Sequence, residues 1–101
     1  MQINKILLEA IALRKCVTAT YNRTTSLLAP YILYTRHDEL FIDAVTVERG
    51  GLPPREVKLG TFKLAGLSDV ELSERTFAID PVFDPALPKY EGVTLFVVQP
   101  G

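Results

Sequence analysis

Residues 40–44 read Leu-Phe-Ile-Asp-Ala, and this stretch decides how the rest of the chain is interpreted. Its side chains alternate, so the leucine, isoleucine and alanine point to one face of a strand, and the phenylalanine and aspartate to the other. A polar turn at residues 37–39 precedes it, and a turn at residues 48–54 with two glycines and two prolines follows it. The stretch therefore predicts one strand of an antiparallel sheet.

Further strands are predicted on both sides of this segment, at residues 16–21, 26–36, 57–64, around 70–72 and 93–98. Pro30 lies inside the second, and because proline cannot donate to a central ladder, we expect that strand to be at an edge, bulged or sharply bent. The apolar pattern of residues 57–64 changes phase at Gly60-Thr61, which predicts a β-bulge. The near-continuous apolar run 93–98 predicts burial on both faces; it either closes the sheet or pairs with another copy of the chain.

The ends of the chain complete the predicted architecture. Residues 2–14 have apolar side chains at three- and four-residue spacing, which predicts an amphipathic helix. Residues 74–92 carry three prolines among large apolar residues, which indicates an extended arm pinned to the sheet by Phe77, Ile79, Val82, Phe83 and Leu87. We expect one domain over residues 1–101, of the α+β class and mostly β: a helix 2–14, a small bent antiparallel barrel of five or six strands over 16–73, and an arm with a last strand over 74–98.

Composition excludes several classes of protein. The net charge is −1, so no global field attracts nucleic acid, and the single cysteine, Cys16, forms no disulfide framework and fits a reducing cytoplasm. No apolar run is long enough for a signal peptide or a membrane span. The sequence has no Gly-rich phosphate loop, no metal-ligand spacing and no nucleophile with a plausible base. We therefore expect a cytoplasmic protein that is not an enzyme and needs no cofactor, metal or membrane.

Asp43 is the one charged residue in an otherwise apolar strand, and an isolated buried carboxylate is costly. We expect a cationic partner on an adjacent strand, with Lys58 and Arg55 the favoured candidates. One interpretation is an ion pair on the barrel surface. The other is that Asp43 and its partner form part of a polar ligand site.

Aromatic and cationic residues also alternate along the predicted strands. Tyrosine or phenylalanine stands at positions 21, 31, 34 and 41, and lysine or arginine at positions 23, 36, 58 and 63. Small barrels hold single-stranded nucleic acid by stacking bases on aromatic rings and neutralising phosphates. The alternative is that the aromatic residues form the core and the cations only solubilise the surface.

The order and spacing of these segments resemble the WYL domain, an SH3/Sm-like β-barrel module of bacterial transcription regulators. Residues 40–42 stand where that family has Trp-Tyr-Leu, and residues 62–67, Phe-Lys-Leu-Ala-Gly-Leu, where it has Phe-Arg-Leu-Asp-Arg-Ile. Pro30 with Leu33 is similar to the family's Pro-x-x-Leu, Ala44 to the small residue after the signature, and residues 76–85 to the tail that follows. Two departures fall in the ligand site, because Phe41 lacks the tyrosine hydroxyl and Gly66 replaces an arginine.

The resemblance implies a stand-alone, non-enzymatic regulatory module that senses a ligand, either single-stranded nucleic acid or a nucleotide-like molecule. The residues expected to line the site are Tyr21, Arg23, Tyr31, Phe41, Asp43, Lys58 and Lys63. A second hypothesis is a protein-interaction or oligomerisation module with a degenerate pocket. It rests on the broad apolar stripe of the helix and on the last strand, and it predicts a homodimer or a complex with a regulator protein.

Overall fold

Two tight turns join the first three strands of the sheet. The computed structural model describes residues 4–100, and its chain runs antiparallel through β1 (Lys15–Tyr21), β2 (Thr24–Arg36) and β3 (Glu39–Arg49). Asn22 and Arg23 connect β1 to β2 with φ of 51° and 65°, and His37 and Asp38 connect β2 to β3 with φ of 51° and 62°. Two consecutive left-handed residues match the twist of a two-residue hairpin, which fixes the register of all three strands.

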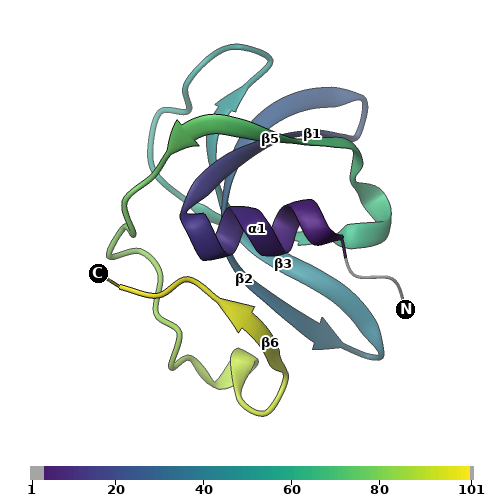
Figure 1. Cartoon of the computed structure of the whole chain (residues 1–101), viewed down its shortest axis with the longest axis vertical. Coiled ribbons are helices and arrows are strands. Elements are labelled where there is room, and N and C mark those ends of the chain that lie inside the picture. The colour runs from purple at the N-terminus through teal and green to yellow at the C-terminus, as the bar shows by residue number, and fades with distance from the viewer. Residues whose placement is uncertain (1–3, 101) are drawn as a thin grey trace.

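The later elements extend this sheet on both sides. They are β4 (Leu59–Lys63), the 3₁₀ turn η1 (Leu64–Gly66), β5 (Ser68–Thr76), the 3₁₀ turn η2 (Pro88–Tyr90) and β6 (Thr94–Val97). The strand order is β4-β3-β2-β1-β5, and β6 pairs with β2 off this path (Figure 1). The fold is therefore α+β and mostly β, with one N-terminal helix and a six-strand antiparallel sheet.

The sheet is not closed into a barrel, and this corrects the prediction from the sequence. β4 pairs only with β3, and β5 pairs only with β1, so these two strands form the open ends of the five-strand order. β4 has only five residues, and η1 turns the chain away directly after it. The next strand then pairs at the far side of the sheet instead of alongside β4.

β2 is the central strand, and its bend lies near Pro30. One edge of β2 pairs with β1 up to Leu28 and with β6 from Ile32 onward, so Pro30 lies where the neighbour on that edge changes. On the other edge the register with β3 shifts between Pro30 and Ile32. A proline is tolerated inside this strand because regular pairing is interrupted there. Of the three predicted alternatives, the register shift supports an irregularity such as a bulge, and an edge position is wrong because β2 has neighbours on both edges.

The predicted bulge at Gly60-Thr61 is wrong. The register of β3 with β4 runs without a shift from Phe41–Lys63 to Val45–Leu59. Val57 lies in the preceding loop and Leu64 in η1, and the remaining two apolar residues, Leu59 and Phe62, are partly buried on opposite faces of a regular strand.

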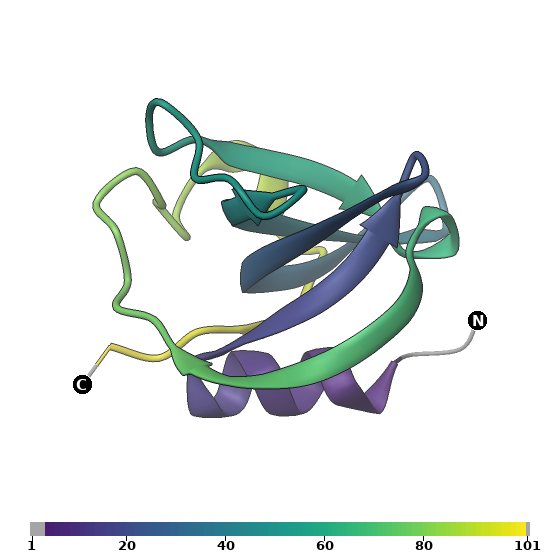
Figure 2. The ribbon, with the colours of Figure 1, turned by 90° about the horizontal axis from the view of Figure 1, so that it is seen from above.

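Helix α1 (Lys5–Leu13) packs against β1, β2 and β5. Asn4 is its N-cap, and the side-chain oxygen accepts hydrogen bonds from the backbone N–H of Ile6 and Leu7. The buried face consists of Leu7, Ala10 and Ile11. Figure 2 shows the helix alongside β5 and β1. Residues 2 and 3 of the predicted helix lie outside the described residues, and no helix within residues 4–100 is long and apolar enough to cross a membrane.

Residues 77–93 between β5 and β6 are the C-terminal arm. Its only regular element is η2, and it is attached to the sheet by side chains, as predicted. Phe77 stacks on Tyr31 at 5.2 Å between ring centroids, and Phe83 is buried, whereas Val82 and Leu87 are exposed. The arm is therefore a second layer that covers part of β2.

The last strand is less buried than predicted. β6 pairs with β2 in the same chain, which agrees with the prediction that it joins the intrachain sheet. However, Leu95 is 47% exposed and Phe96 38% exposed. Burial on both faces is therefore wrong, because the outward face of β6 has no described layer over it.

Candidate functional site

The most concentrated polar site in the molecule is built around Asp43. This side chain is only 1% exposed, and its two oxygens accept hydrogen bonds from four donors. Oδ1 accepts from the Tyr34 hydroxyl at 2.7 Å and the Thr61 hydroxyl at 2.8 Å. Oδ2 accepts from the Lys89 ammonium at 2.9 Å and from the Tyr90 hydroxyl. These five residues are called the Asp43 cluster.

Opposing effects act on the pKa of Asp43 and of Lys89. Burial alone raises the pKa of Asp43, but the hydrogen bonds from Tyr34, Tyr90, Lys89 and Thr61 outweigh burial and hold it below 3.8. For Lys89, burial lowers the pKa, and the hydrogen bond to Asp43 with its negative charge raises it above 10.5. Burial, followed by the bond to Asp43, raises the pKa of both tyrosine hydroxyls. The cluster therefore holds an ionised carboxylate and an ionised ammonium at neutral pH.

The arm supplies half of the donors in this cluster. Tyr34 on β2 and Thr61 on β4 belong to the sheet, whereas Lys89 and Tyr90 belong to η2. Two further hydrogen bonds join the arm to Tyr31, whose hydroxyl donates to the Ala78 carbonyl at 3.2 Å and accepts from the Asp80 N–H at 2.9 Å. Both the polar face of β3 and the phenol of Tyr31 are thus occupied by the chain itself.

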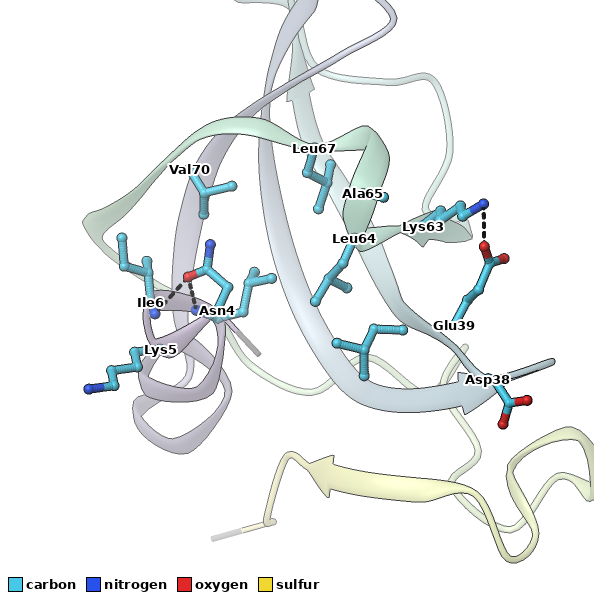
Figure 3. Close-up of a pocket in the computed structure, with 12 residues that line it drawn as sticks. Asn4, Lys5, Ile6, Asp38, Glu39, Lys63, Leu64, Ala65, Leu67 and Val70 are labelled. Carbon is cyan, nitrogen blue, oxygen red and sulfur yellow. Dashed lines mark hydrogen bonds and ion pairs between the residues drawn. The ribbon is translucent and has the colours of Figure 1, made fainter. Parts of the chain in front are cut away.

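A separate cavity of about 690 Å³ lies beside the N-terminal end of α1 and is called the helix-end pocket (Figure 3). Its apolar lining comes from α1, β3, η1 and β5, and its polar lining from side chains at the ends of α1, β3 and β4. The apolar residues are Ile6, Leu7, Leu40, Leu64, Ala65, Leu67 and Val70, and the polar residues are Asn4, Lys5, Asp38, Glu39 and Lys63. In Figure 3 the ammonium of Lys63 is joined to the carboxylate of Glu39, at 2.8 Å.

The helix-end pocket and the Asp43 cluster lie on opposite faces of β3. Leu40 lines the pocket, and Asp43 is three residues further along a strand whose register with β2 is regular from Leu40 to Asp43. Side chains an odd number of residues apart on a strand point to opposite faces. A molecule in the pocket would therefore not touch the Asp43 carboxylate.

The structure gathers only part of the site predicted from the sequence. Phe41 stacks against Tyr34 beside Asp43, and Tyr31 lies on the same side under the arm. Lys63 is at the helix-end pocket, and exposed Lys58 contacts Glu56 in the loop before β4. The other two residues lie elsewhere: exposed Arg23 is in the β1–β2 turn, and half-buried Tyr21 packs edge-on to Phe62.

Tyr21 belongs to a small hollow of about 130 Å³ at that end of the sheet. Its other lining residues are Asn22, Ser26, Thr46, Arg49 and Phe62. A Cβ at Gly66 would approach the Tyr21 ring to 3.0 Å, so the glycine allows close packing of η1 on that ring. The predicted continuous aromatic and basic face is therefore divided among four places.

The partner of Asp43 was predicted incorrectly, since Lys89 takes the place expected for Lys58 or Arg55. Lys89 lies 46 residues away in an irregular segment, and periodicity gives no sign of this contact. One signal was present: Lys89 is the only lysine or arginine after Arg75. A buried aspartate facing an apolar arm with one cation would have indicated this pair.

Other chemistry is limited in residues 4–100. These residues contain no group of three or more His, Cys, Asp or Glu side chains placed to hold a metal ion. Cys16 is fully buried, and burial raises the pKa of its thiol, which disfavours the reactive thiolate.

Comparisons with protein-family models, with curated proteins and with solved structures found no match to this chain.

Proposed function

We propose that this chain is a non-enzymatic ligand-sensing module that binds a small amphipathic molecule in the helix-end pocket. The observation that carries the proposal is the cavity itself. Its volume of about 690 Å³ falls within the roughly 300–1,000 Å³ that is usual for small-molecule sites. Seven of its twelve lining residues are apolar, and the polar ones supply both signs of charge.

The lining indicates the shape of the ligand. Leu64 begins η1 and Leu67 follows it, and Val70 on β5 faces them across the cavity together with Ile6 on α1 (Figure 3). These side chains suit an apolar body. A polar end group would lie at the rim of the cavity, because the ammonium groups of Lys5 and Lys63 point away from its interior (Figure 3) and that of Lys63 pairs with Glu39.

The resemblance to the WYL domain agrees with this proposal in the order of elements. A helix precedes five strands that follow the path β4-β3-β2-β1-β5, and a short 3₁₀ turn separates β4 from β5. Binding of nucleic acid has less support. The predicted residues Tyr31 and Asp43 are covered by the arm, and Lys58 and Lys63 both contact glutamates.

A fluorescent amphiphile tests the pocket directly, with 1-anilinonaphthalene-8-sulfonate as the probe. The chain contains no tryptophan, so an introduced tryptophan both fills space and reports binding. Val70→Trp fills the pocket and is expected to weaken probe binding at least tenfold. Val57→Trp is the matched control, since Val57 is half exposed in a loop that does not line the pocket, and it should leave the affinity unchanged. Equal affinity in all three proteins would show that the probe binds elsewhere and would refute the proposal.

A protein-interaction module remains a second candidate because two large apolar side chains of β6, Leu95 and Phe96, are exposed. Surfaces of this kind mark contacts with other proteins when they are large enough. Sedimentation should then show a dimer that dissociates when both residues are replaced by aspartate. A monomeric wild-type protein at high concentration would exclude the homodimer form.

A further inference from the structure

The Asp43 cluster has the composition of a cation-binding site. Beyond its contact with Oδ2 of Asp43, the Lys89 nitrogen lies 3.4 Å from the Thr61 hydroxyl. It also lies 5.5 Å from the centroid of the Tyr34 ring and 5.2 Å from that of the Tyr90 ring. A carboxylate, a hydroxyl and two aromatic faces around one nitrogen are the features by which proteins recognise an ammonium group.

The approach to this site is open beside Lys89 and Thr61, both of which are exposed. The Asp43 side chain is 2% exposed, whereas that of Lys89 is 42% exposed. The lysine chain therefore reaches in from solvent, and the other residues of the cluster do not depend on it for their position. Tyr34 and Thr61 stand on the sheet, and Tyr90 is buried by its own contacts with Tyr34 and Phe83.

Removal of Lys89 would leave a strong preference for another cation. Three hydroxyl donors would still hold Asp43 ionised, but no positive charge would balance it. A buried Asp43 carboxylate without a positive partner is unfavourable, and a cation that binds beside it restores the ion pair lost with Lys89. The Asp43 carboxylate and the Thr61 hydroxyl both accept from the Lys89 nitrogen. A cation that can donate N–H hydrogen bonds to both therefore fits better than a bare metal ion.

We propose that Asp43, Thr61 and the rings of Tyr34 and Tyr90 form a binding site for a primary ammonium group, which Lys89 fills as an internal ligand. In the wild-type protein the site is blocked by the protein's own side chain. In Lys89→Ala it is open to a small alkylamine. This inference is independent of the helix-end pocket, which lies on the other face of β3. If the ammonium site is disproved, the proposal for the pocket is unaffected.

The test uses n-propylammonium, whose three carbons and nitrogen replace the atoms that Lys89→Ala removes beyond Cβ. Thermal unfolding is followed at pH 7 with rising n-propylammonium chloride, and sodium chloride keeps the ionic strength constant. The expected result is a saturable rise in the Tm of Lys89→Ala, by about 6–11 °C at a tenfold excess over the dissociation constant. Tetramethylammonium, which has no N–H to donate, should give no comparable rise.

Three control proteins complete the experiment. The wild type should show no rise, because Lys89 fills the site, and Lys58→Ala should show none, because that lysine contacts only exposed Glu56. The double variant Lys89→Ala/Asp43→Asn should lose the response. If Lys89→Ala is unfolded without amine, refolding by n-propylammonium in circular dichroism supports the proposal. A Tm or folded fraction that responds no more to n-propylammonium than to sodium chloride overturns it and leaves Lys89 as a structural ion pair only.

Discussion

Replacing Asp43 by asparagine is the sharpest test of how the arm is held. The variant keeps the size and shape of the side chain, and its Oδ1 can still accept from Tyr34 and Thr61. It loses the negative charge, and an NH₂ group now faces the donors of Lys89 and Tyr90. Since a hydrogen bond to a charged group contributes about 1.5–3 kcal/mol, we assign about 2 kcal/mol to the buried bond from Tyr90.

The contribution of Lys89 is smaller, because its side chain is 42% exposed and solvent screens its charge. We assign about 1 kcal/mol to it, which gives a total loss of about 3 kcal/mol. For a domain of this size, that loss lowers the Tm by about 12–24 °C.

Urea denaturation of the variant and the wild type at pH 7 measures the difference directly, with m-values compared to check that the transition remains cooperative. Asp84→Asn is the matched control on the same arm. Asp84 is exposed and its side chain accepts only from the nearby Ala86 N–H, so its replacement should change stability by no more than about 0.5 kcal/mol. A loss below about 1 kcal/mol in Asp43→Asn would refute the reasoning, because the carboxylate would then give no net stabilisation over a neutral amide.

Two further predictions concern the same layer. The pKa of Asp43 in the folded protein lies below its ordinary 3.8, so its stabilising contribution is complete above about pH 5 and is lost as the pH falls through the lowered value. The stability difference between wild type and Asp43→Asn should therefore shrink between pH 5 and about pH 2 in urea titrations, and a constant difference would contradict the assignment. Tyr31→Phe keeps the ring stacked on Phe77 but removes the two hydrogen bonds to the arm, so a loss of about 1–2 kcal/mol is expected. Hydrogen exchange should show faster exchange of the Asp80 amide in that variant, and unchanged protection would mean that the hydroxyl does not hold the arm.

The strands of the central meander could be predicted because their signals are local. Alternation and two short polar turns placed β1, β2 and the start of β3 close to their observed bounds, although β3 extends to Arg49, and Pro30 indicated the irregularity in β2. Closure of the sheet could not be predicted in this way. Whether β4 meets β5 depends on the path of η1 and on the length of β4, and neither is determined by alternation.

The site was harder to predict, because the residues that complete it are distant in sequence. Asp43 was recognised from its isolation among apolar neighbours, which is a local signal. Its donors come from β2, β4 and η2, and Lys89 lies in a segment with neither helical nor strand periodicity. The aromatic residues were also identified, but the pattern does not distinguish a ring that stacks on a ligand from one that stacks on the chain's own Phe77.

The two candidate sites differ in whether a side chain of the protein already fills them, so binding experiments can tell them apart. The helix-end pocket is open in the wild-type chain, so an amphiphile that binds there should lose affinity in Val70→Trp and be indifferent to Lys89→Ala. The ammonium site is filled by Lys89, so an amine that binds there should be visible only once that side chain is removed. A ligand that binds the wild type and responds to neither change would belong to neither site. It would direct attention to the hollow between Tyr21 and Arg49, where an aromatic ring and an unpaired cation among the described residues still lie side by side.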